Sequence, residues 1–277
     1  MQGDTGRFRP RRRWGQNFLI NPGAIETIVS AFAPQPDDRV IEVGPGHGAL
    51  TEAIVSRVGR LLAVEVDPTL VGALEERLDR FRTGGQLEIV EGDVLALGLG
   101  PLLRRLDTTG RPARLIGNLP YNIATEVILS GLRHAPMLAD LHVMVQREVA
   151  ERMTSEPGRK SYGSLSVLCQ TYARIERVLR LRPGSFKPRP RVESQMIRLV
   201  PHSIDGHLPP FGDLSVLLRA AFEQRRRTLL NNLSRIAPGG SDGAGRWIRS
   251  ADLDPRARPE AIPVEGYLAL LRHRPAV

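Results

Sequence analysis

Hydrophobic and polar residues recur with two different periods along the first 200 residues. Short apolar runs, of the kind that fill buried strands, alternate with stretches whose apolar residues recur every three or four positions, as on one face of a helix. The expected strands are 38–43, 60–67, 86–93, 113–118 and 140–146, and the expected helices are 24–32, 48–58, 68–81, 124–134 and 147–153. This alternation predicts an α/β fold with a doubly wound, mostly parallel sheet.

Two later segments, 175–181 and 194–201, look like strands without a clear helix between them, which predicts an antiparallel edge of the sheet. A linker rich in Pro and Gly follows, and after it the pattern is helical only. The segments with helical spacing are 214–233, 245–253 and 264–273. Residues 237–245 between them are expected to form a flexible loop. The sequence therefore predicts a sheet domain over 1–202 and a small all-helical domain over 203–277.

The charge balance changes this ordinary picture of a globular protein. The 277 residues are 41% apolar and 25% charged, but Lys+Arg 39 against Asp+Glu 30 gives a formal net charge of +9. Nearly all the positive charge is arginine, because the only lysines are Lys160 and Lys187. A compositional bias toward arginine would explain this, and so would a polyanionic partner whose phosphates accept bidentate guanidinium bonds. Composition leaves both explanations open.

The single cysteine, Cys169, excludes an internal disulfide and a cysteine-based metal cluster. It lies in an apolar helical pattern, which predicts a buried structural thiol. The arginine-rich N-terminus lacks the apolar core of a secretory signal, and no apolar run approaches membrane-spanning length. We therefore expect a cytoplasmic protein with no membrane partner and no metal.

Candidate chemistry lies where the expected strands end, because open α/β sheets bind ligands beyond the carboxyl ends of their strands. The first strand runs into Gly44-Pro45-Gly46-His47-Gly48. Glycines there allow close approach of the backbone to a ligand, although the motif alone would also fit a tight turn. The second strand ends at Glu65, about 20 residues after the first glycine, where a carboxylate holds ribose hydroxyls. These two features would suit NAD equally well.

The third strand ends near Asp93, whose carboxylate is suited to accept hydrogen bonds from the exocyclic amine of an adenine. The glycine loop, the ribose acid and Asp93 together resemble S-adenosylmethionine-dependent methyltransferases. The lone loop histidine, His47, is given no role.

The fourth strand ends in Asn118-Leu119-Pro120-Tyr121. The amine of adenine is a poor nucleophile because its lone pair is delocalised into the ring. An Asn carbonyl and a backbone carbonyl, held rigid by Pro120, could each accept one N–H and draw the nitrogen toward tetrahedral geometry. Tyr121 could stack on a base swung out of its helix. Taken alone, the motif would also fit a strand-end turn with a packed tyrosine.

A closer resemblance rests on eight segments that cover most of the chain from residue 15. They are GQNFLI (15–20), VIEVGPGHGALTEAI (40–54), VEVD (64–67), GNLPYNIAT (117–125), VQREVAERM (145–153), YGSLSVLCQ (162–170), FKPRPRVES (186–194) and AFEQRRRTLLNNL (221–233). Together they resemble the small-subunit rRNA adenine N6-dimethyltransferases. The resemblance implies a Rossmann-like methyltransferase sheet with a helical C-terminal domain, and S-adenosylmethionine as cofactor. It also implies transfer of four methyl groups to two adjacent adenines near the 3′ end of 16S rRNA, in the small ribosomal subunit or its precursor.

The resemblance also implies roles for individual residues. The implied cofactor-binding residues are Asn17, Leu19, Gly44, Gly46, Glu65, Asp93 and Asn118. The implied catalytic residues are Asn118, Pro120, Tyr121 and Phe186, with Phe186 and Tyr121 stacking around the flipped base. Two positions depart from the family pattern: Glu126, where proline is expected in many relatives, and His47, where a small or aliphatic residue is expected. Neither touches a proposed role.

Two alternatives remain. The sister family that methylates large-subunit rRNA shares the cofactor loop and the Asn-x-Pro-Tyr motif, but Leu119 and the segments 186–194 and 221–233 favour the small-subunit branch. A non-catalytic RNA-binding or ribosome-assembly factor could have the same fold. The complete set of cofactor and amine-binding residues argues against a purely binding role.

Arginines gather in three places that would suit contact with RNA phosphates. The predicted RNA-binding residues are Arg11, Arg12, Arg13, Arg189, Arg225, Arg226 and Arg227. Any one cluster would also fit a solvated face. Residues 1–14 are expected to form a basic flexible tail that orders on RNA.

Overall fold

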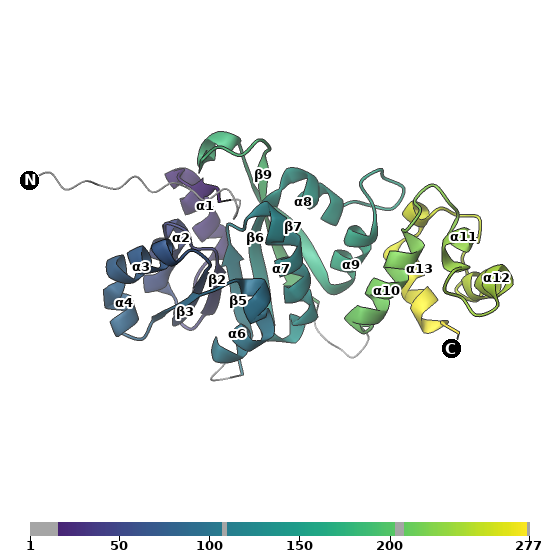
Figure 1. Ribbon diagram of the computed structural model, residues 1–277, viewed down its shortest axis with the longest axis horizontal. Coiled ribbons are helices and arrows are strands. Elements are labelled where there is room, and N and C mark those ends of the chain that lie inside the picture. Colours follow the sequence, from purple (N-terminus) through teal and green to yellow (C-terminus); the bar gives the residue numbers. More distant parts are fainter. Residues whose placement is uncertain (1–15, 107–109, 203–207, 276–277) are drawn as a thin grey trace, which may run out of the picture. The chain divides into compact units, whose positions relative to one another are not determined.

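The fold is described by a computed structural model, which covers residues 16–106, 110–202 and 208–275 (Figure 1). Its strands are β1 (Phe18–Leu19), β2 (Arg39–Val43), β3 (Arg60–Glu65), β4 (Leu87–Glu91), β5 (Ala113–Gly117), β6 (Leu138–Gln146), β7 (Ala173–Leu181), β8 (Phe186–Lys187) and β9 (Ser194–Pro201). Its α-helices are α1 (Pro22–Phe32), α2 (Ala49–Ile54), α3 (Pro68–Arg77), α4 (Asp79–Thr83), α5 (Val94–Leu97), α6 (Leu99–Leu106), α7 (Tyr121–Arg133), α8 (Arg147–Met153), α9 (Ser164–Tyr172), α10 (Phe211–Ala221), α11 (Leu229–Leu233), α12 (Gly240–Ser250) and α13 (Val264–Arg272). Short 3-10 helices are η2 (Val55–Arg57), η3 (Ala135–Met137), η4 (Pro183–Ser185) and η5 (Pro259–Ala261). The predicted tail 1–14, with Arg11, Arg12 and Arg13, lies outside the described residues.

The main sheet confirms the predicted doubly wound α/β class. Its strand order is β4-β3-β2-β5-β6-β9-β7. Neighbouring strands from β4 to β6 pair in parallel, and the far edge is antiparallel, as predicted. The chain leaves β2 toward one edge and returns to build β5 on its other side. The neighbouring ends of β2 and β5 therefore form the switch point at which such sheets bind ligands.

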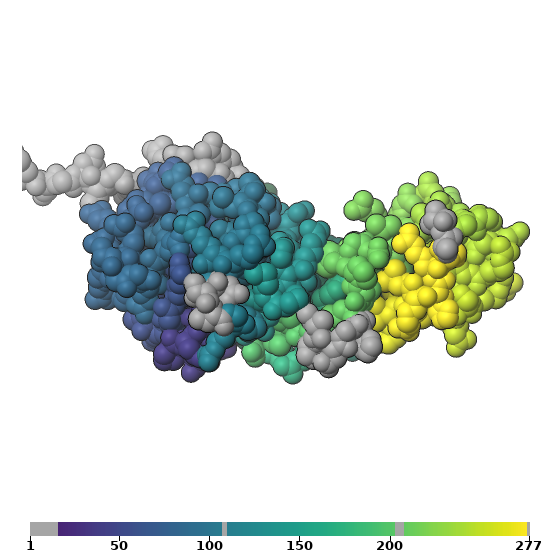
Figure 2. All heavy atoms as spheres, turned by 90° about the horizontal axis from the view of Figure 1, so that it is seen from below, coloured from purple at the N-terminus to yellow at the C-terminus, as the bar shows by residue number. Residues whose placement is uncertain are grey.

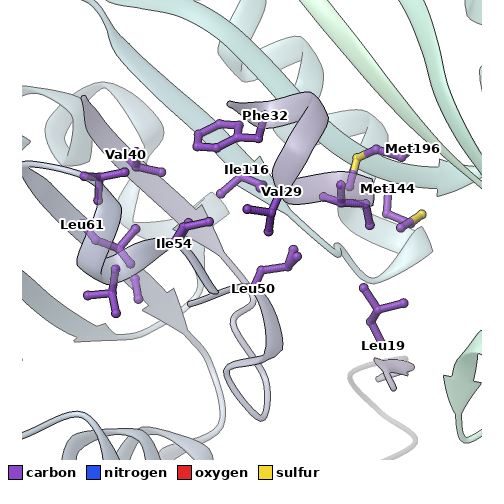
Figure 3. Packing of buried hydrophobic residues seen from close by; sticks show 14 of the residues in the cluster. Leu19, Val29, Phe32, Val40, Leu50, Ile54, Leu61, Ile116, Met144 and Met196 are labelled. Atoms are coloured by element: carbon purple, nitrogen blue, oxygen red, sulfur yellow. The ribbon is translucent and has the colours of Figure 1, made fainter. Parts of the chain in front are cut away.

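The two faces of the sheet are covered by different helices. On one face, residues of α1 and α2 such as Phe32 and Ile54 are fully buried against Val40 of β2 and Ile116 of β5 (Figure 3). Each such side chain stabilises the fold by about 1.5–3 kcal/mol through its removal from water. On the other face, α7 packs closely on β6. Because α7 begins at Tyr121, directly after the end of β5, this packing also positions the segment that carries Asn118 and Pro120.

The chain divides into two compact units. One comprises Met1–Arg147 with Glu176–Arg198, and the other comprises Glu148–Ile175 with Leu199–Val277. The domain boundary predicted at residues 202 and 203 stays a prediction.

Within the second unit, α13 packs against α9, α10 and α12, and the yellow atoms of α13 lie beside green atoms of the helices that precede it (Figure 2). Trp247 Nε1 donates a 2.8 Å hydrogen bond to the carbonyl of Leu270, which ties α12 to α13. The loop expected over 237–245 is wrong from Gly240 onward, since α12 begins there. A Cβ at Gly243 would lie only 1.7 Å from the Pro238 carbonyl oxygen, so glycine is used for close packing and not for flexibility.

The helical spacing expected over 214–233 is also interrupted. Helix α10 ends at Ala221, and α11 begins only at Leu229. Thr228 caps α11, because its side chain accepts a hydrogen bond from the N–H of Asn231. The three arginines Arg225 to Arg227 therefore lie in the turn between two helices.

Candidate active site

A cavity opens at the carboxyl ends of β2, β3, β4 and β5. It is lined by Gln16, Asn17, Phe18, Leu19, Glu42, Val43, Gly44, Pro45, Gly46, His47, Ala49, Leu50, Val64, Glu65, Val66, Gly92, Asp93, Val94, Asn118, Pro120, Asn122 and Ile123. All seven residues predicted to bind the cofactor are among them. Four strand ends and the N-terminal segment before α1 thus converge on one cavity.

The loop after β2 has the conformation that its glycines predict. Gly44 and Gly46 have φ of 68° and 58°, in the left-handed region that disfavours other residues. A Cβ on Gly46 would lie 2.8 Å from the ring of Phe18, so the N-terminal segment could not approach the loop with a larger residue there. Phe18 also contacts the ring of His47, with centroids 4.3 Å apart. The N-terminal segment and the glycine loop therefore form adjoining walls of the cavity.

The side chain of Glu65 holds this loop in place through a hydrogen bond to its backbone. Its Oε2 accepts a 3.0 Å hydrogen bond from the N–H of Gly46, and its Oε1 accepts bonds of 2.9 and 3.0 Å from the N–H groups of Val66 and Asp67. Burial raises the pKa of Glu65, and these three bonds oppose that rise by stabilising the ionised form. With two bonds on Oε1 and one on Oε2, the carboxylate keeps acceptor capacity on Oε2 for a ligand hydroxyl.

Asp93 is exposed at the mouth of the cavity and is the N-cap of α5. Its Oδ1 accepts a 2.9 Å hydrogen bond from the N–H of Leu95, which holds the carboxylate in place. The other oxygen is left as an acceptor for a ligand.

Asn118 and Asn17 join the fourth strand end to the N-terminal segment. Asn118 Nδ2 donates a 2.8 Å hydrogen bond to the main-chain carbonyl of Asn17. This bond sets the orientation of the amide, so that its oxygen is the atom available to accept a hydrogen bond from a ligand amine.

Tyr121, the first residue of α7, is half-buried. Its hydroxyl lies 2.6 Å from the hydroxyl of Ser194, the first residue of β9. Burial raises the pKa of Tyr121, so the phenol is neutral at physiological pH and does not act as a base.

Phe186 lies in the hydrophobic core and is 1% exposed. It pairs with Leu19 across the antiparallel strands β1 and β8. The stacking of Phe186 with Tyr121 around a base stays a prediction, and in the structure Phe186 supports the segment that carries Leu19.

The whole length of the site, from the N-terminal segment to β9, falls within one known family pattern. A family model described as ribosomal RNA adenine dimethylase matches residues 7–263.

The chain belongs to the ribosomal RNA adenine dimethylase family.

Relatives agree with this assignment. The dimethylase is 42% identical over 270 residues to "Ribosomal RNA small subunit methyltransferase A" of Cupriavidus metallidurans, covering 95% of this chain and 92% of that protein. It is 40% identical over 267 residues to the protein of the same name from Chromohalobacter salexigens, covering 95% and 90%. The predicted family is thereby confirmed.

Solved structures agree on the fold. A dimethyladenosine transferase from Plasmodium falciparum superposes with a TM-score of 0.75 at 23% identity, covering 91% of this chain and 95% of that one. The 23S rRNA methyltransferase ErmE superposes with a TM-score of 0.66 at 25% identity, covering 93% and 99%. These likenesses confirm the methyltransferase fold.

Glu42 and Ser194 are among the residues of the site that are not predicted from the sequence. Glu42 lines the cavity from β2 and is 1% exposed, and Ser194 holds the hydroxyl of Tyr121. Glu42 could have been found from the period of β2, because it lies two residues after Val40 and so on the same buried face. No signal in the sequence joins Ser194 to Tyr121, since 73 residues separate them.

The predicted RNA-binding arginines differ in their surroundings. Arg189 is exposed between β8 and β9. Arg225 Nη2 donates hydrogen bonds of 2.9 and 2.7 Å to the carbonyls of Lys160 and Tyr162, so it also holds the 156–162 loop in place. Arg226 and Arg227 are exposed and form no ion pair with any residue that the structure describes.

Backbone hydrogen bonds bring further cations beside this turn. Leu229 N–H donates to the Ala257 carbonyl at 2.7 Å, and Gly158 N–H donates to the Glu260 carbonyl at 2.7 Å. Three chain segments thus meet in the second unit. The resulting basic cluster consists of Arg159, Lys160, Arg226, Arg227, Arg256 and Arg258, all exposed. Four of these six lie in segments far from the arginine runs and are not predicted from the sequence.

The single thiol of the chain adds no reactive group to the site. Cys169 is buried, as predicted, and burial raises the pKa of its thiol to about 12. In the described ranges, no group of three His, Cys, Asp or Glu residues could hold a metal ion. No helix of the described chain is long and apolar enough to cross a membrane.

Proposed function

We propose that this rRNA adenine dimethylase uses S-adenosylmethionine to dimethylate the N6 amines of two adjacent adenines near the 3′ end of 16S rRNA. The observation that carries the proposal is the fixed amide of Asn118 at the switch point of the sheet, with its oxygen left to accept from an amine.

The donors and acceptors of the cavity fit S-adenosylmethionine. Glu65 Oε2 suits a ribose hydroxyl, and the second oxygen of Asp93 suits the amine of an adenine. The glycine loop, with Gly44 and Gly46, leaves room for the methionine moiety beside Asn17 and Leu19. When bound, this cofactor supplies an electrophilic methyl group on a sulfonium.

The target amine needs two acceptors, and the Asn118 segment offers two. One is Asn118 Oδ1. The Pro120 carbonyl is already used, because it accepts from the N–H groups of Ile123 and Ala124 in the first turn of α7. The Leu119 carbonyl, held by the rigid proline that follows, is therefore the second acceptor. Each acceptor would take a hydrogen bond from one N–H of the amine, and these bonds would be strongest when the nitrogen becomes tetrahedral. The two fixed acceptors would thereby stabilise the transition state.

No tuned base is needed for this step. The amine becomes acidic as it gains the methyl group, and its proton can leave to water. Tyr121, a neutral phenol, would act through its ring, by stacking on the flipped adenine.

The relatives support the small subunit as the substrate. The proteins from Acidovorax ebreus and Cupriavidus metallidurans are 39% and 42% identical to this chain, and both carry "small subunit" in their names. The large-subunit alternative is supported by the shared cofactor loop and by the more distant likeness to ErmE, at 25% identity. A non-catalytic role would leave the Asn118 and Glu65 geometry without a purpose. Action on ribosomal subunits implies that the enzyme works in the cytoplasm.

The basic cluster of the second unit would bind phosphates of the same RNA. Six exposed cations without an ion pair to any described residue make a strong positive potential, and arginine matches phosphate geometry. Arg189, between β8 and β9, would add a contact from the first unit.

Tritium-labelled S-adenosylmethionine tests the assignment of the subunit. Small and large subunits from cells that lack both methylations are incubated separately with the enzyme. Label is expected in small subunits only. Label in large subunits alone would favour the sister activity, and no label with cofactor bound would favour the non-catalytic alternative.

A further inference from the structure

Glu42 is a buried carboxyl with no chemical task in the proposed reaction. It is the next-to-last residue of β2, near the end of the strand at which the cavity opens, and it is 1% exposed. Its Oε2 has no hydrogen-bond partner among the described residues, and neither has the buried Oγ1 of Thr51 on α2. A buried carboxylate with one oxygen left without a partner is unfavourable, so such a group either stays protonated or awaits a cation.

The charges that face Glu42 do not compensate it. Across the β2–β3 pair lies Glu65, whose negative charge opposes ionisation of Glu42. His47 and Asp93 are the other titratable residues that line the cavity, and no lining residue is Lys or Arg. Burial raises the pKa of Glu42 to about 8. The adjacent Thr51 opposes this rise without cancelling it, and the charge of Glu65 adds a smaller rise. Two acids thus share one cavity without a basic side chain between them.

We propose that Glu42 carries a proton on its carboxyl in the ligand-free enzyme and releases it to solvent when a cationic ligand enters the cavity. The inference rests on the proposed function, because S-adenosylmethionine carries an α-ammonium and a sulfonium and so supplies the positive charge that the cavity lacks. The O–H bond of Glu42 breaks, the proton passes to water or buffer, and the carboxylate remains beside the new cation.

Proton release has a measurable size. At pH 7 a carboxyl with a pKa of about 8 is roughly nine-tenths protonated, so binding should expel close to one proton. Binding of S-adenosylmethionine to the wild type should therefore include the release of this proton, whereas binding to Glu42→Gln should not. Between pH 7 and pH 9 the affinity of the wild type should therefore rise about tenfold relative to that of Glu42→Gln. The affinity of the wild type is divided by that of Glu42→Gln because the α-ammonium of the ligand also titrates between pH 7 and pH 9. That titration affects both proteins equally and cancels in the ratio.

Isothermal titration calorimetry with S-adenosylmethionine in buffers of different ionisation enthalpy measures the protons exchanged. The expected result at pH 7 is release of close to one proton by the wild type and by Glu26→Gln, an exposed acid on α1, and almost none by Glu42→Gln. 5′-Methylthioadenosine, a neutral ligand without the methionine charges, should bind the wild type without proton release.

Equal release by the wild type and by folded Glu42→Gln would overturn the inference and point to Glu65. If Glu42→Gln did not fold, the wild type alone would be measured at several pH values. The number of protons that it releases on binding should decline between pH 7 and pH 8.5, and a constant number would overturn the inference. Binding without any proton release would contradict the inference and leave the proposed function intact. Absence of binding would contradict both.

Discussion

The side-chain nitrogen of Asn118 and the main-chain carbonyl of Asn17 lie 2.8 Å apart, across 101 residues of chain. This hydrogen bond joins the end of β5 to the segment that precedes α1. Because the amide nitrogen is engaged, the oxygen of Asn118 is held as an acceptor before any substrate arrives. The bond also connects the residue that we propose to face the target amine with the N-terminal segment that lines the cavity.

Replacing Asn118 with alanine should reduce turnover on the order of 10²-fold or more, because it removes an acceptor that matters most as the amine becomes tetrahedral. Single-turnover kinetics at saturating cofactor measures this reduction, and RNA affinity should barely change. Wild-type turnover in the variant would rule out the two-acceptor mechanism.

Glu65→Ala should weaken binding of S-adenosylmethionine by about 1.5–3 kcal/mol, the range of a charge-assisted hydrogen bond. The variant also releases three backbone N–H groups, so its melting temperature must be measured beside the affinity. Glu26→Ala, an exposed acid on α1, is the matched control and should bind as the wild type does. Unchanged affinity in folded Glu65→Ala would remove Glu65 from the cofactor site.

Tyr121→Ala should abolish most methylation, whereas Tyr121→Phe should keep much of it, because stacking requires the ring and not the hydroxyl. Ser194→Ala removes the same hydrogen bond from the other side. Its effect should be small and should not add to that of Tyr121→Phe in the double variant. Full additivity would mean that Ser194 acts on something other than Tyr121.

The stability of the ligand-free enzyme should depend on pH through Glu42. Its pKa is raised to about 8 in the fold, so the folded protein holds this proton more tightly than the unfolded chain does. Stability from Glu42 is therefore fully present below its unfolded pKa and is lost as pH rises toward 8. Relative to the wild type, Glu42→Gln should gain on the order of 3 kcal/mol between pH 5 and pH 8, measured by urea unfolding. A constant difference across that range would show that Glu42 is already ionised.

Of the three arginines in the turn after α10, we expect Arg225 to stabilise the fold and Arg226 and Arg227 to contact RNA. Arg225→Ala should lower the melting temperature, because Arg225 holds the carbonyls of Lys160 and Tyr162. Replacing both Arg226 and Arg227 with alanine should leave the melting temperature near that of the wild type. The log-log salt dependence of subunit binding should become shallower by about 0.7–0.9 for each phosphate that the variant no longer neutralises.

The control for this pair is Arg235→Ala, since Arg235 is already paired with Glu223 at 2.7 Å. It should change the salt dependence little. An unchanged slope in the folded double variant would mean that this turn does not contact RNA.

Much of the fold is predictable because its signals are local. Alternation of strand and helix patterns indicates the parallel sheet, and the positions of Gly44, Glu65, Asp93 and Asn118 at strand ends place them at one edge. The start of α12 is not predictable in the same way because its glycines look like a loop, whereas Gly243 is required by the nearby Pro238 carbonyl. A single sequence does not show which backbone approaches which glycine.

Features that depend on contacts across long separations are not predictable from the sequence. The Tyr121–Ser194 bond arises only from tertiary packing, as do the contacts of Arg225 with the 156–162 segment and of Leu229 with Ala257. Glu42 is different, because the period of β2 places it on the same face as Val40. An acid in a strand is usually exposed, however, and here the strand is buried on both faces.

Mass spectrometry of the 16S rRNA 3′ fragment, after unmethylated small subunits have been incubated with the enzyme and S-adenosylmethionine, tests the proposed dimethylation most directly. We expect four added methyl groups, two on each of two adjacent adenines, and almost none with Asn118→Ala over the same period. An unmodified 3′ fragment after incubation with the wild-type enzyme, or methyl groups on another base, would contradict this expectation.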